Sequence, residues 1–491
     1  VAKHMELLSF FLMNCIQRVR SRDYNQVNIN TIELNINTIK LNINIMRSFL
    51  KGISLASSIV CSISVCNISV LQAQEGSSES QESVKVAVDK KYQNEMKTLS
   101  EKPVIKAAFK TIMDIEPETH KNLITLNEIP APPFKEQKRA AKFMEMMRAI
   151  GADSIWIDKA GNVLALIKGK TGKKTVMLEA HLDTVFPEGT DVTVKQSGDT
   201  LRAPGIGDDT RGLAVLLAVM KSMKQAKVKT DADIVFGGIV GEEGLGDLRG
   251  VKQLFKDQKP KIDSYIAIDG GGIGGITSGG TGSHRYRITF KGPGGHSYGA
   301  FGLANPHNAS ARAIYYFIQE ANAYTRSGAK TTYNVGVMGG GTSVNAIPFE
   351  SWMEVDMRSE APERLSGIDS LLQTAIKKAL LEENQMKRRG KDLTVDVALV
   401  GDRPSGVQSN TLPLVQRSMA SAMFLGATPR LGISSTNSNI PISKGVPAVT
   451  IGRGGVGGGA HALDEWWMND KGHLAIQNAL LILVSEAGLV D

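Results

Sequence analysis

The chain of 491 residues is long enough for two or three domains, and its 42% hydrophobic and 22% charged content excludes a fibrous or wholly disordered protein. Its formal net charge is +8, but residues 1–73 contain seven Lys and Arg against three Asp and Glu and supply +4 of it. The remaining 50 basic and 46 acidic residues leave only +4, which argues against nucleic acid as a partner.

Residues 46–73 have the pattern of a signal peptide. A short basic start at Met46 is followed by an apolar, serine-rich run and then by Leu71-Gln72-Ala73 before a polar stretch. We therefore expect cleavage near Ala73 and export to a periplasmic or secreted location, with no stable membrane span after cleavage. A lipid anchor on Cys61 or Cys66 is an alternative, although a bulky valine precedes each of these cysteines.

The segments on either side of this signal peptide carry little information about the fold. Residues 24–45 are a low-complexity repeat of Asn and Ile, and we interpret residues 1–45 as a non-native leader translated from a start codon set too early. Residues 74–100 are expected to be a linker. All three cysteines lie before residue 74, so a metal in the body must be held by histidine and carboxylate side chains.

Helices and buried strands alternate from residue 101 onward. Apolar residues at helical spacing predict two helices within 100–150, and helical stretches also run through 213–223 and 251–255. Short apolar runs at 175–180, 232–240 and 264–269 predict buried strands. This order predicts an α/β domain with a mainly parallel sheet, of which residues 101–283 form the first part.

The pattern changes at residue 284. A strand, a helix over 309–323, two strands, a charged helix over 361–389 and a last strand at 392–400 give the order β-α-β-β-α-β. This order predicts a separate α+β domain of ferredoxin-like type over residues 284–400. Residues 401–491 return to a helix at 413–424 and a strand at 447–452, so the small domain is inserted into a split α/β domain.

Five segments place acidic or histidine side chains at strand ends and helix starts, where functional groups gather in open α/β sheets. They are His181-Leu182-Asp183, a Gly-rich turn with Asp208-Asp209, the pair Glu242-Glu243, Asp269 before two glycines, and His461 in GGGAH. Each alone has a simpler interpretation as a helix cap, a solvated surface pair or a hydrogen-bonded structural histidine. Together, in a body with only seven histidines, they predict one site.

This set of side chains suits hydrolysis of an amide bond with two bridged divalent metal ions. One carboxylate must bridge the ions, and imidazoles and further carboxylates must complete each coordination sphere. A further carboxylate must accept the proton of the attacking water. Two adjacent glutamates can divide the last two roles, one as a metal ligand and the other as a base.

The motifs HLDTV, GIGDDTRG, GEEG, DGGG and GGGAH, in this order within residues 105–491, resemble the di-zinc exopeptidase family of peptidase T, carboxypeptidase G and succinyl-diaminopimelate desuccinylase. The resemblance implies a zinc-peptidase-type catalytic domain in two parts, 101–283 and 401–491. It also implies that residues 284–400 form a lid that makes a homodimer. Two divalent metal ions per subunit are expected, Zn²⁺ with Co²⁺ or Mn²⁺ as substitutes.

The resemblance implies that five side chains bind the two ions: His181, Asp208 and Asp269 at one ion, and Glu243, His461 and the shared Asp208 at the other. Asp183 would hold and polarise the His181 imidazole. Glu242 would be the general base. Asp208 is preferred to Asp209 as the bridge because the family's bridging aspartate is the first after the Gly-containing turn.

Three residues of the expected lid match substrate-binding positions of the family. His296, in KGPGGHS, matches a histidine that reaches into the neighbouring subunit's site to stabilise the oxyanion, although a turn histidine is the simpler interpretation. Asn345 and Arg358 match positions that contact the substrate backbone and its free carboxylate, which the planar guanidinium can bind with two hydrogen bonds. A surface salt bridge is the alternative for Arg358. The sequence departs from the family at Thr210, where many relatives have Lys, and at Asn437, where Asp is common.

We expect metal-dependent hydrolysis of an amide bond at one end of a small peptide, of aminopeptidase or tripeptidase type. Asp269, where several carboxypeptidase-like members have Glu, is the only reason for preferring the aminopeptidase. A carboxypeptidase or an N-acyl amino acid deacylase would use the same site, so an N-acyl amino acid is the alternative substrate. A non-catalytic periplasmic peptide-binding protein is the alternative from a different class.

Overall fold

The computed structural model of the protein describes residues 87–490. The expected leader, the signal peptide and the cysteines considered for lipidation lie outside the described residues. Helix α3 (Lys90–Glu101) occupies much of the range expected as a linker. Its residues Tyr92, Met96 and Leu99 lie on one face at helical spacing and are buried, and the helix packs against α11 (Pro413–Phe424). The linker prediction is therefore wrong for these residues.

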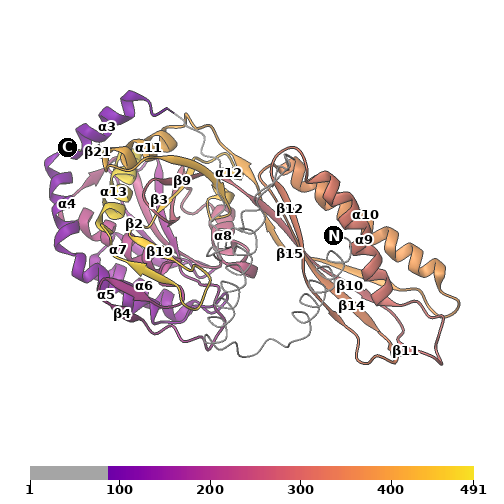
Figure 1. The fold of residues 1–491 in the computed structure, drawn as a ribbon. Helices are drawn as coiled ribbons and strands as arrows, with labels where there is room; N and C mark the ends of the chain where they lie inside the picture. Colours follow the sequence, from indigo (N-terminus) through magenta and orange to yellow (C-terminus); the bar gives the residue numbers. More distant parts are fainter. Residues whose placement is uncertain (1–86, 491) are drawn as a thin grey trace, which may run out of the picture. The chain divides into compact units, whose positions relative to one another are not determined.

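The α/β domain is built on one mixed sheet (Figure 1). Its strand order is β1-β2-β7-β3-β8-β18-β9-β16, and β17 pairs with β9. The central strands β7, β3, β8 and β18 are parallel to one another, and antiparallel strands lie toward both edges. This confirms the predicted α/β class with a mainly parallel sheet. The bounds are β1 Ser154–Ile157, β2 Val163–Ile167, β3 Thr175–His181, β7 Asp233–Ile239, β8 Ser264–Gly270, β9 Gly275–Gly280, β16 Gly406–Val407, β17 Arg430–Ser434 and β18 Ala448–Gly452.

Helices cover both faces of this sheet. The remaining helices of the domain are α4 Pro103–Asp114, α5 Glu116–Asn127, α6 Gln137–Ile150, α7 Thr210–Gln225, α8 Arg249–Asp257, α12 Asn439–Ser443 and α13 His473–Ala487. Three helices, α4 to α6, stand where two were predicted, because Pro117 at the start of α5 begins a new helix. In the part of the chain that the structure describes, no helix has the length and apolar character needed to span a bilayer.

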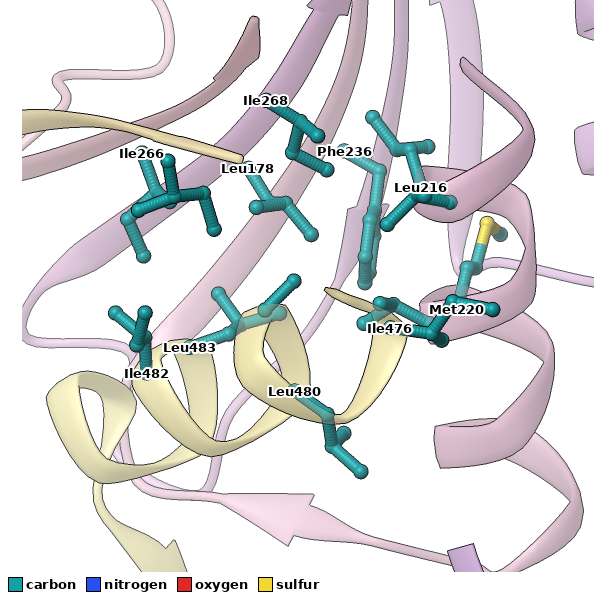
Figure 2. Packing of buried hydrophobic residues seen from close by; sticks show 14 of the residues in the cluster. Leu178, Leu216, Met220, Phe236, Ile266, Ile268, Ile476, Leu480, Ile482 and Leu483 are labelled. Carbon is teal, nitrogen blue, oxygen red and sulfur yellow. The ribbon is translucent and has the colours of Figure 1, made fainter. Parts of the chain in front are cut away.

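The central strands are buried on both faces, because successive residues of each strand pack into clusters on opposite sides of the sheet. Leu178, Phe236 and Ile266 pack with α7 and α13 on one face (Figure 2). Their chain neighbours Met177 and Val235 pack with α8 and α12 on the other. Each such side chain contributes about 1.5–3 kcal/mol when it is fully buried. The sheet is therefore held from both sides, and its strand ends are fixed points from which polar side chains can project.

The inserted domain has the predicted ferredoxin-like order. Its antiparallel sheet has the strand order β12-β14-β10-β15, and α9 and α10 supply buried side chains to its core. The bounds are β10 Gly282–Lys291, α9 Pro306–Tyr324, β12 Thr331–Gly340, β14 Glu350–Ser359, α10 Pro362–Met386 and β15 Thr394–Arg403. The first and last strands thus begin at Gly282 and end at Arg403, slightly outside the predicted range of 284–400.

Short strands complete the described chain. One small sheet has the order β19-β20-β5-β4, and two further pairs are β21-β6 and β11-β13. Their bounds are β4 Lys195–Ser197, β5 Thr200–Arg202, β6 Lys229–Thr230, β11 Gly295–His296, β13 Ala346–Ile347, β19 Val456–Gly458, β20 Trp466–Met468 and β21 Leu489–Val490. The pairing of β20 with β5 joins the two sequence-separated parts of the α/β domain beside the polar cluster described below.

Candidate metal centre

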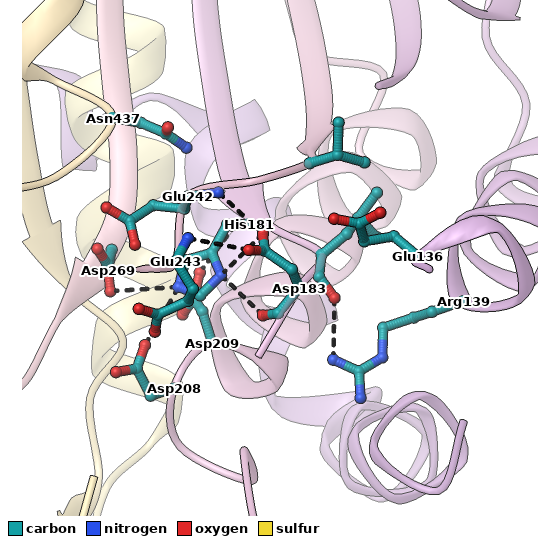
Figure 3. Close-up of polar contacts among 12 residues, drawn as sticks. Glu136, Arg139, His181, Asp183, Asp208, Asp209, Glu242, Glu243, Asp269 and Asn437 are labelled. Atoms are coloured by element: carbon teal, nitrogen blue, oxygen red, sulfur yellow. Dashed lines mark hydrogen bonds and ion pairs between the residues drawn. The ribbon is translucent and has the colours of Figure 1, made fainter. Parts of the chain in front are cut away.

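Three neighbouring parallel strands bring a group of polar side chains to one edge of the sheet (Figure 3). Strand β3 ends at His181, the loop after β7 carries Glu242 and Glu243, and Asp269 lies at the end of β8. Asp208 and Asp209 join them from the turn before α7. The carboxyl ends of parallel strands meet at one edge, so this gathering follows from the strand order.

The His181 imidazole is buried and held by contacts at both ring nitrogens. Nδ1 lies 3.0 Å from the backbone oxygen of Asp183 and 3.7 Å from the Asp183 carboxylate. Nε2 lies 3.2 Å from Asp208 Oδ1 and 3.8 Å from Asp269 Oδ1. A backbone acceptor at Nδ1 fixes the tautomer in which Nε2 can be a metal ligand. The residue holding this ring is therefore Asp183, as expected, but its nearest atom is the carbonyl oxygen and not the carboxylate.

The Asp183 carboxylate has a different task. Its two oxygens accept hydrogen bonds from the backbone N–H groups of Glu242, at 3.0 Å, and Glu243, at 2.9 Å. Asp183 is fully buried, and a buried carboxylate requires such donors. It thereby ties the turn after β3 to the turn after β7, and fixes the backbone of the two glutamates relative to His181.

The Gly-rich turn that presents Asp208 is held from the second part of the domain. The Glu465 carboxylate accepts hydrogen bonds from the backbone N–H groups of Gly205, Gly207 and Asp208 at 2.8–2.9 Å. Burial raises the pKa of Glu465 to about 7. The Asp208 carboxylate lies between the two histidines, with Oδ2 3.3 Å from His461 Nε2.

Asp209 points away from this gap, and its peptide bond with Asp208 is cis. It is fully buried, and its Oδ2 accepts a hydrogen bond of 3.1 Å from the backbone N–H of His181. Gly212 is needed beside it, because a Cβ there would lie 2.2 Å from Asp209 Oδ1 and 2.4 Å from the backbone oxygen of Ile268. The geometry therefore places the Asp208 oxygens between the histidines, while Asp209 supports the end of β3.

The two adjacent glutamates differ in their surroundings. Glu243 Oε1 lies 3.1 Å from His461 Nε2. Glu242 Oε1 instead accepts a hydrogen bond of 3.1 Å from Arg403 Nη1. Burial raises the pKa of Glu242 to about 8, with Arg403 opposing the rise. Burial also raises the pKa of Glu243, against the hydrogen bond from His461.

The charges in the cluster are unbalanced. The carboxyl groups are those of Asp183, Asp208, Asp209, Glu242, Glu243 and Asp269, and the guanidinium groups in contact with them are those of Arg403 and Arg453. Arg453 Nη1 lies 3.3 Å from Asp208 and 3.4 Å from Asp269. Burial acts to raise the pKa of Asp208, but Arg453 and the His181 hydrogen bond hold it well below its usual range. Hydrogen bonds to Asp208 and Glu243 raise the pKa of His461 to about 10. A surplus of buried carboxylates calls for further cations.

Divalent metal ions fit this donor set. Among the described residues, three groups of side chains have ligand atoms within 4.8 Å of one another: His181, Asp208 and Asp269; Asp208, Glu243 and His461; and His181, Glu242 and Glu243. The first two are the two ligand sets expected from the sequence, and they share Asp208. Mixed imidazole and carboxylate donors suit zinc and related transition metals.

The three predicted lid residues lie at two places in the inserted domain. His296 in β11 and Asn345 are close together, because Ser297 N donates a hydrogen bond of 2.8 Å to Asn345 O. Both side chains are exposed, and in the described part of the chain neither has a hydrogen bond or ion pair with the metal cluster. Arg358 donates to Asp356 at 2.8 Å, the salt bridge given above as its alternative, and also lines a pocket of about 160 Å³.

Four supporting residues of the site were not found from the sequence. Arg403 ends strand β15, Arg453 directly follows β18, and Glu465 lies four residues after His461, which are weak signals. Arg139 is fully buried in α6 and donates a hydrogen bond of 3.0 Å to the backbone oxygen of Leu182, at the turn after β3. The sequence signal that could have identified Arg139 is the position of an arginine on an otherwise apolar helix face.

The fold and this cluster together define a metallohydrolase of the α/β class. The sequence matches Peptidase family M20/M25/M40 over residues 177–481, and the chain belongs to this family of metal-dependent peptidases. A Pyrococcus abyssi protein that carries the provisional name LysW-lysine/LysW-ornithine hydrolase is 31% identical over 171 residues, 35% of this chain and 45% of that protein. Carboxypeptidase G2 of Pseudomonas sp. is 25% identical over 248 residues, 50% of this chain and 56% of the enzyme. The chain thus spans about half the length of these relatives.

Solved structures share the fold over most of the described chain. A tripeptidase from Staphylococcus aureus superimposes with a TM-score of 0.63 at 22% identity, covering 76% of this chain and 99% of that one. The aminopeptidase PepT from Bacillus cereus gives 0.61 at 19% identity, with coverages of 76% and 99%. An M20 carboxypeptidase from Sulfolobus solfataricus gives 0.59 at 17% identity, with coverages of 74% and 98%. These likenesses show that the described chain shares the fold of these proteins.

Proposed function

We propose that this protein is an exopeptidase of aminopeptidase or tripeptidase type, which hydrolyses the amide bond at one end of a small peptide. The observation that carries the proposal is the pair of three-donor groups that share Asp208, with the buried carboxyl of Glu242 beside them. A tripeptidase and an aminopeptidase among the similar structures support this choice of substrate.

His181, Asp208 and Asp269 would hold one divalent ion, and Asp208, Glu243 and His461 a second. Zn²⁺ fits best, with Co²⁺ or Mn²⁺ as substitutes. When bound, such ions polarise the scissile carbonyl and make a water molecule more acidic. The protein residues around them then have to orient the substrate and move the proton.

Glu242 is the group that moves the proton. As the water oxygen attacks the carbonyl carbon, the Glu242 carboxylate accepts the water proton and then transfers it to the amide nitrogen as the C–N bond breaks. The base has no net gain of protons over the cycle. The burial of Glu242 excludes bulk water from this transfer, and its contact with Arg403 holds one of its two oxygens.

The Arg358 pocket would bind the free carboxylate of the peptide. Its lining has two cationic residues, Arg358 and Lys330, against one acidic residue, Glu360, together with hydroxyl groups that include those of Ser434 and Ser435. Cations and hydroxyl donors are the groups that bind a carboxylate. Such a pocket also suits a carboxypeptidase or an N-acyl amino acid deacylase, and the M20 carboxypeptidase of similar fold makes this the second candidate.

We also propose that the inserted domain forms a homodimer in which His296 of a second copy stabilises the oxyanion. The support is a group of exposed apolar side chains near His296 in the sequence, Tyr298 and Phe301, and another beside Asn345, Val344 and Phe349. Exposed apolar side chains that gather in this way are typical of interaction surfaces. Sedimentation of the purified protein tests this, and a monomer at micromolar concentration would contradict it.

Export remains part of the proposal, since the signal peptide predicted at 46–73 lies outside the described residues. The native protein should begin near residue 74, and N-terminal sequencing of protein recovered from the periplasm or medium would check this. A native start inside residues 1–45 would contradict the interpretation of that segment as a non-native leader.

A panel of free, N-blocked and C-amidated di- and tripeptides tests the activity. The mature chain would be assayed with added Zn²⁺ or Co²⁺, after chelation, and as the Glu242→Gln variant, which controls for contaminating peptidases. We expect cleavage that requires both metal and a free amino terminus. Cleavage of N-acyl substrates with a free carboxylate would instead establish the second candidate. Metal binding without cleavage of any peptide would contradict both and favour a binding protein.

A further inference from the structure

Arg403 is the last residue of strand β15 and is 4% exposed. Its guanidinium contacts three groups at once. Nη1 donates to Glu242 Oε1 at 3.1 Å and to Ser435 Oγ at 3.1 Å, and Nη2 donates to the backbone oxygen of Glu242. One buried arginine therefore joins the end of the inserted domain, the turn after β7 and the segment after β17.

These contacts hold both the backbone and the side chain of Glu242. Its N–H donates to the Asp183 carboxylate, and its carbonyl oxygen and Oε1 accept from Arg403. In the described part of the chain, Oε2 has no hydrogen bond. A carboxylate with one oxygen held and the other available has a fixed orientation, which a group that accepts a proton from a positioned water needs.

Ser435 extends the contact toward the substrate pocket. It lines the pocket that also contains Arg358 and Lys330, while its hydroxyl accepts from Arg403. A substrate carboxylate in this pocket would lie against the segment that holds one side of the Arg403 guanidinium. Arg403 therefore contacts both Glu242 and one residue of the pocket lining, Ser435.

The polar groups around Arg403 are not arranged for greatest stability. Among residues 87–490, its Nε has no hydrogen-bond partner, and the hydroxyls of Ser283 and Ser405 are also buried without partners. Ser283 is paired with Arg403 across β10 and β15, and Ser405 follows two residues later. A buried ion pair is weak evidence for a stabilising role, and unpaired buried donors oppose stability. A functional role accounts for keeping a charged group in this place.

We propose that Arg403 is a positioning residue that fixes the Glu242 carboxylate for proton transfer and links its placement to the segment lining the substrate pocket. The proposal rests on the function proposed above, in which Glu242 is the base. Arg403 does not reach the reacting atoms itself. Its effect should therefore appear in kcat and not in metal binding.

The test compares Arg403→Met and Arg403→Lys with wild type on the best peptide of the panel. We expect Arg403→Met to lower kcat about 10- to 100-fold, the effect of losing a hydrogen bond to a charged group, with KM changed less than about threefold. Arg403→Lys should recover about tenfold, because an ammonium can still donate to Glu242 Oε1 but not to all three acceptors at once. Metal content should equal that of wild type.

Arg417→Met is the matched control. Arg417 also pairs with carboxylates, Glu486 at 2.7 Å and Glu95 at 3.0 Å, but in the α3, α11 and α13 region. The Arg417→Met variant measures how far stability falls when a partly buried arginine loses its ion pairs with carboxylates away from the metal cluster. We expect a lowered melting temperature with kcat within about twofold of wild type. An equal fall of kcat in Arg403→Met and Arg417→Met would overturn the proposal.

A double-mutant cycle with Glu242→Asp gives a readout that a purely structural role would not produce. The shortened carboxylate cannot keep both its place and its contact with Arg403, so adding Arg403→Met should lower the residual kcat less than about threefold. If the fold-loss of kcat in the double variant equals the product of the fold-losses in the two single variants, Arg403 acts independently of Glu242. If the wild-type protein cleaves no peptide, the proposed function itself is wrong. If the wild type is active and Arg403→Met has the same kcat, only the role of Arg403 is wrong.

Discussion

Substituting Glu242 by Gln removes a proton acceptor while keeping the shape of the site. The amide oxygen of Gln can still accept from Arg403, and the backbone contacts of residue 242 with Asp183 and Arg403 do not involve the side chain. Neither of the two expected ligand sets that share Asp208 contains Glu242. The variant should therefore bind metal and remain folded.

The size of the effect follows from the role of a general base. Its loss typically lowers the rate by a factor of about 10² to 10⁴, which corresponds to about 2.7–5.4 kcal/mol of activation free energy. The free energy of unfolding should change by less than about 2 kcal/mol, because only the ionic part of one hydrogen bond is lost. We thus expect a large loss of kcat together with a small change in the free energy of unfolding.

The assay measures kcat on the best peptide, metal content by elemental analysis, and thermal unfolding of the same preparation. Glu243→Gln is the matched comparison, since it changes the neighbouring carboxyl, which lies against His461, and should reduce metal content. Turnover by Glu242→Gln within tenfold of wild type would refute the role of Glu242 as base. Loss of metal from Glu242→Gln would instead place Glu242 among the ligands, as in the third group of donors.

Two further predictions concern the bridge and the inserted domain. Asp208→Ala should lose one or both metal ions, whereas Asp209→Ala should lower the melting temperature and leave a bridging ligand in place; elemental analysis that shows unchanged metal in Asp208→Ala would disprove the bridge. The hydrogen bond to Asp369 raises the pKa of His284 from 6.5, so its stabilisation is fully present below the unfolded value and is lost as pH rises through the folded one. His284→Gln should therefore cost roughly 1 kcal/mol of unfolding free energy near pH 5.5 and much less near pH 9, and equal costs at both pH values in urea unfolding would contradict this.

The gathering of the metal-cluster residues was predictable because buried strands and the points where they end can be recognised in local patterns. Runs such as 175–180 and 264–269 are apolar on both faces, which indicates central parallel strands, and such strands end at a common edge. These patterns alone indicate that His181, Asp269 and the glutamate pair lie together. The choice of Asp208 and not Asp209 as the bridge stays a prediction; the structure shows only that the Asp208 carboxylate lies near the histidines and that Asp209 accepts from the His181 backbone.

The supporting contacts were not predictable in the same way. Which atom of Asp183 meets the His181 ring depends on side-chain and turn geometry that has no sequence period. Arg403 and Glu465 act across 161 and 257 residues of sequence, respectively, and a single chain gives no signal for contacts of that span. Similarly, α3 was missed because a polar helix with a narrow apolar stripe resembles a linker in composition.

The split of the α/β domain has a direct consequence for how the site is formed. Strand β18, from the second part, pairs in parallel with β8 from the first, and the residues after β18 supply Arg453, His461 and Glu465. Glu465 holds the turn that presents Asp208, so the position of this expected ligand, although it is encoded in the first part, depends on the second. The chain passes between the two parts through the inserted domain, and it leaves that domain at Arg403, in contact with Glu242. The position of Glu242 is thus set at the point where the chain returns from the inserted domain. This is why we propose that a residue of the last strand of that domain acts on proton transfer without touching the substrate.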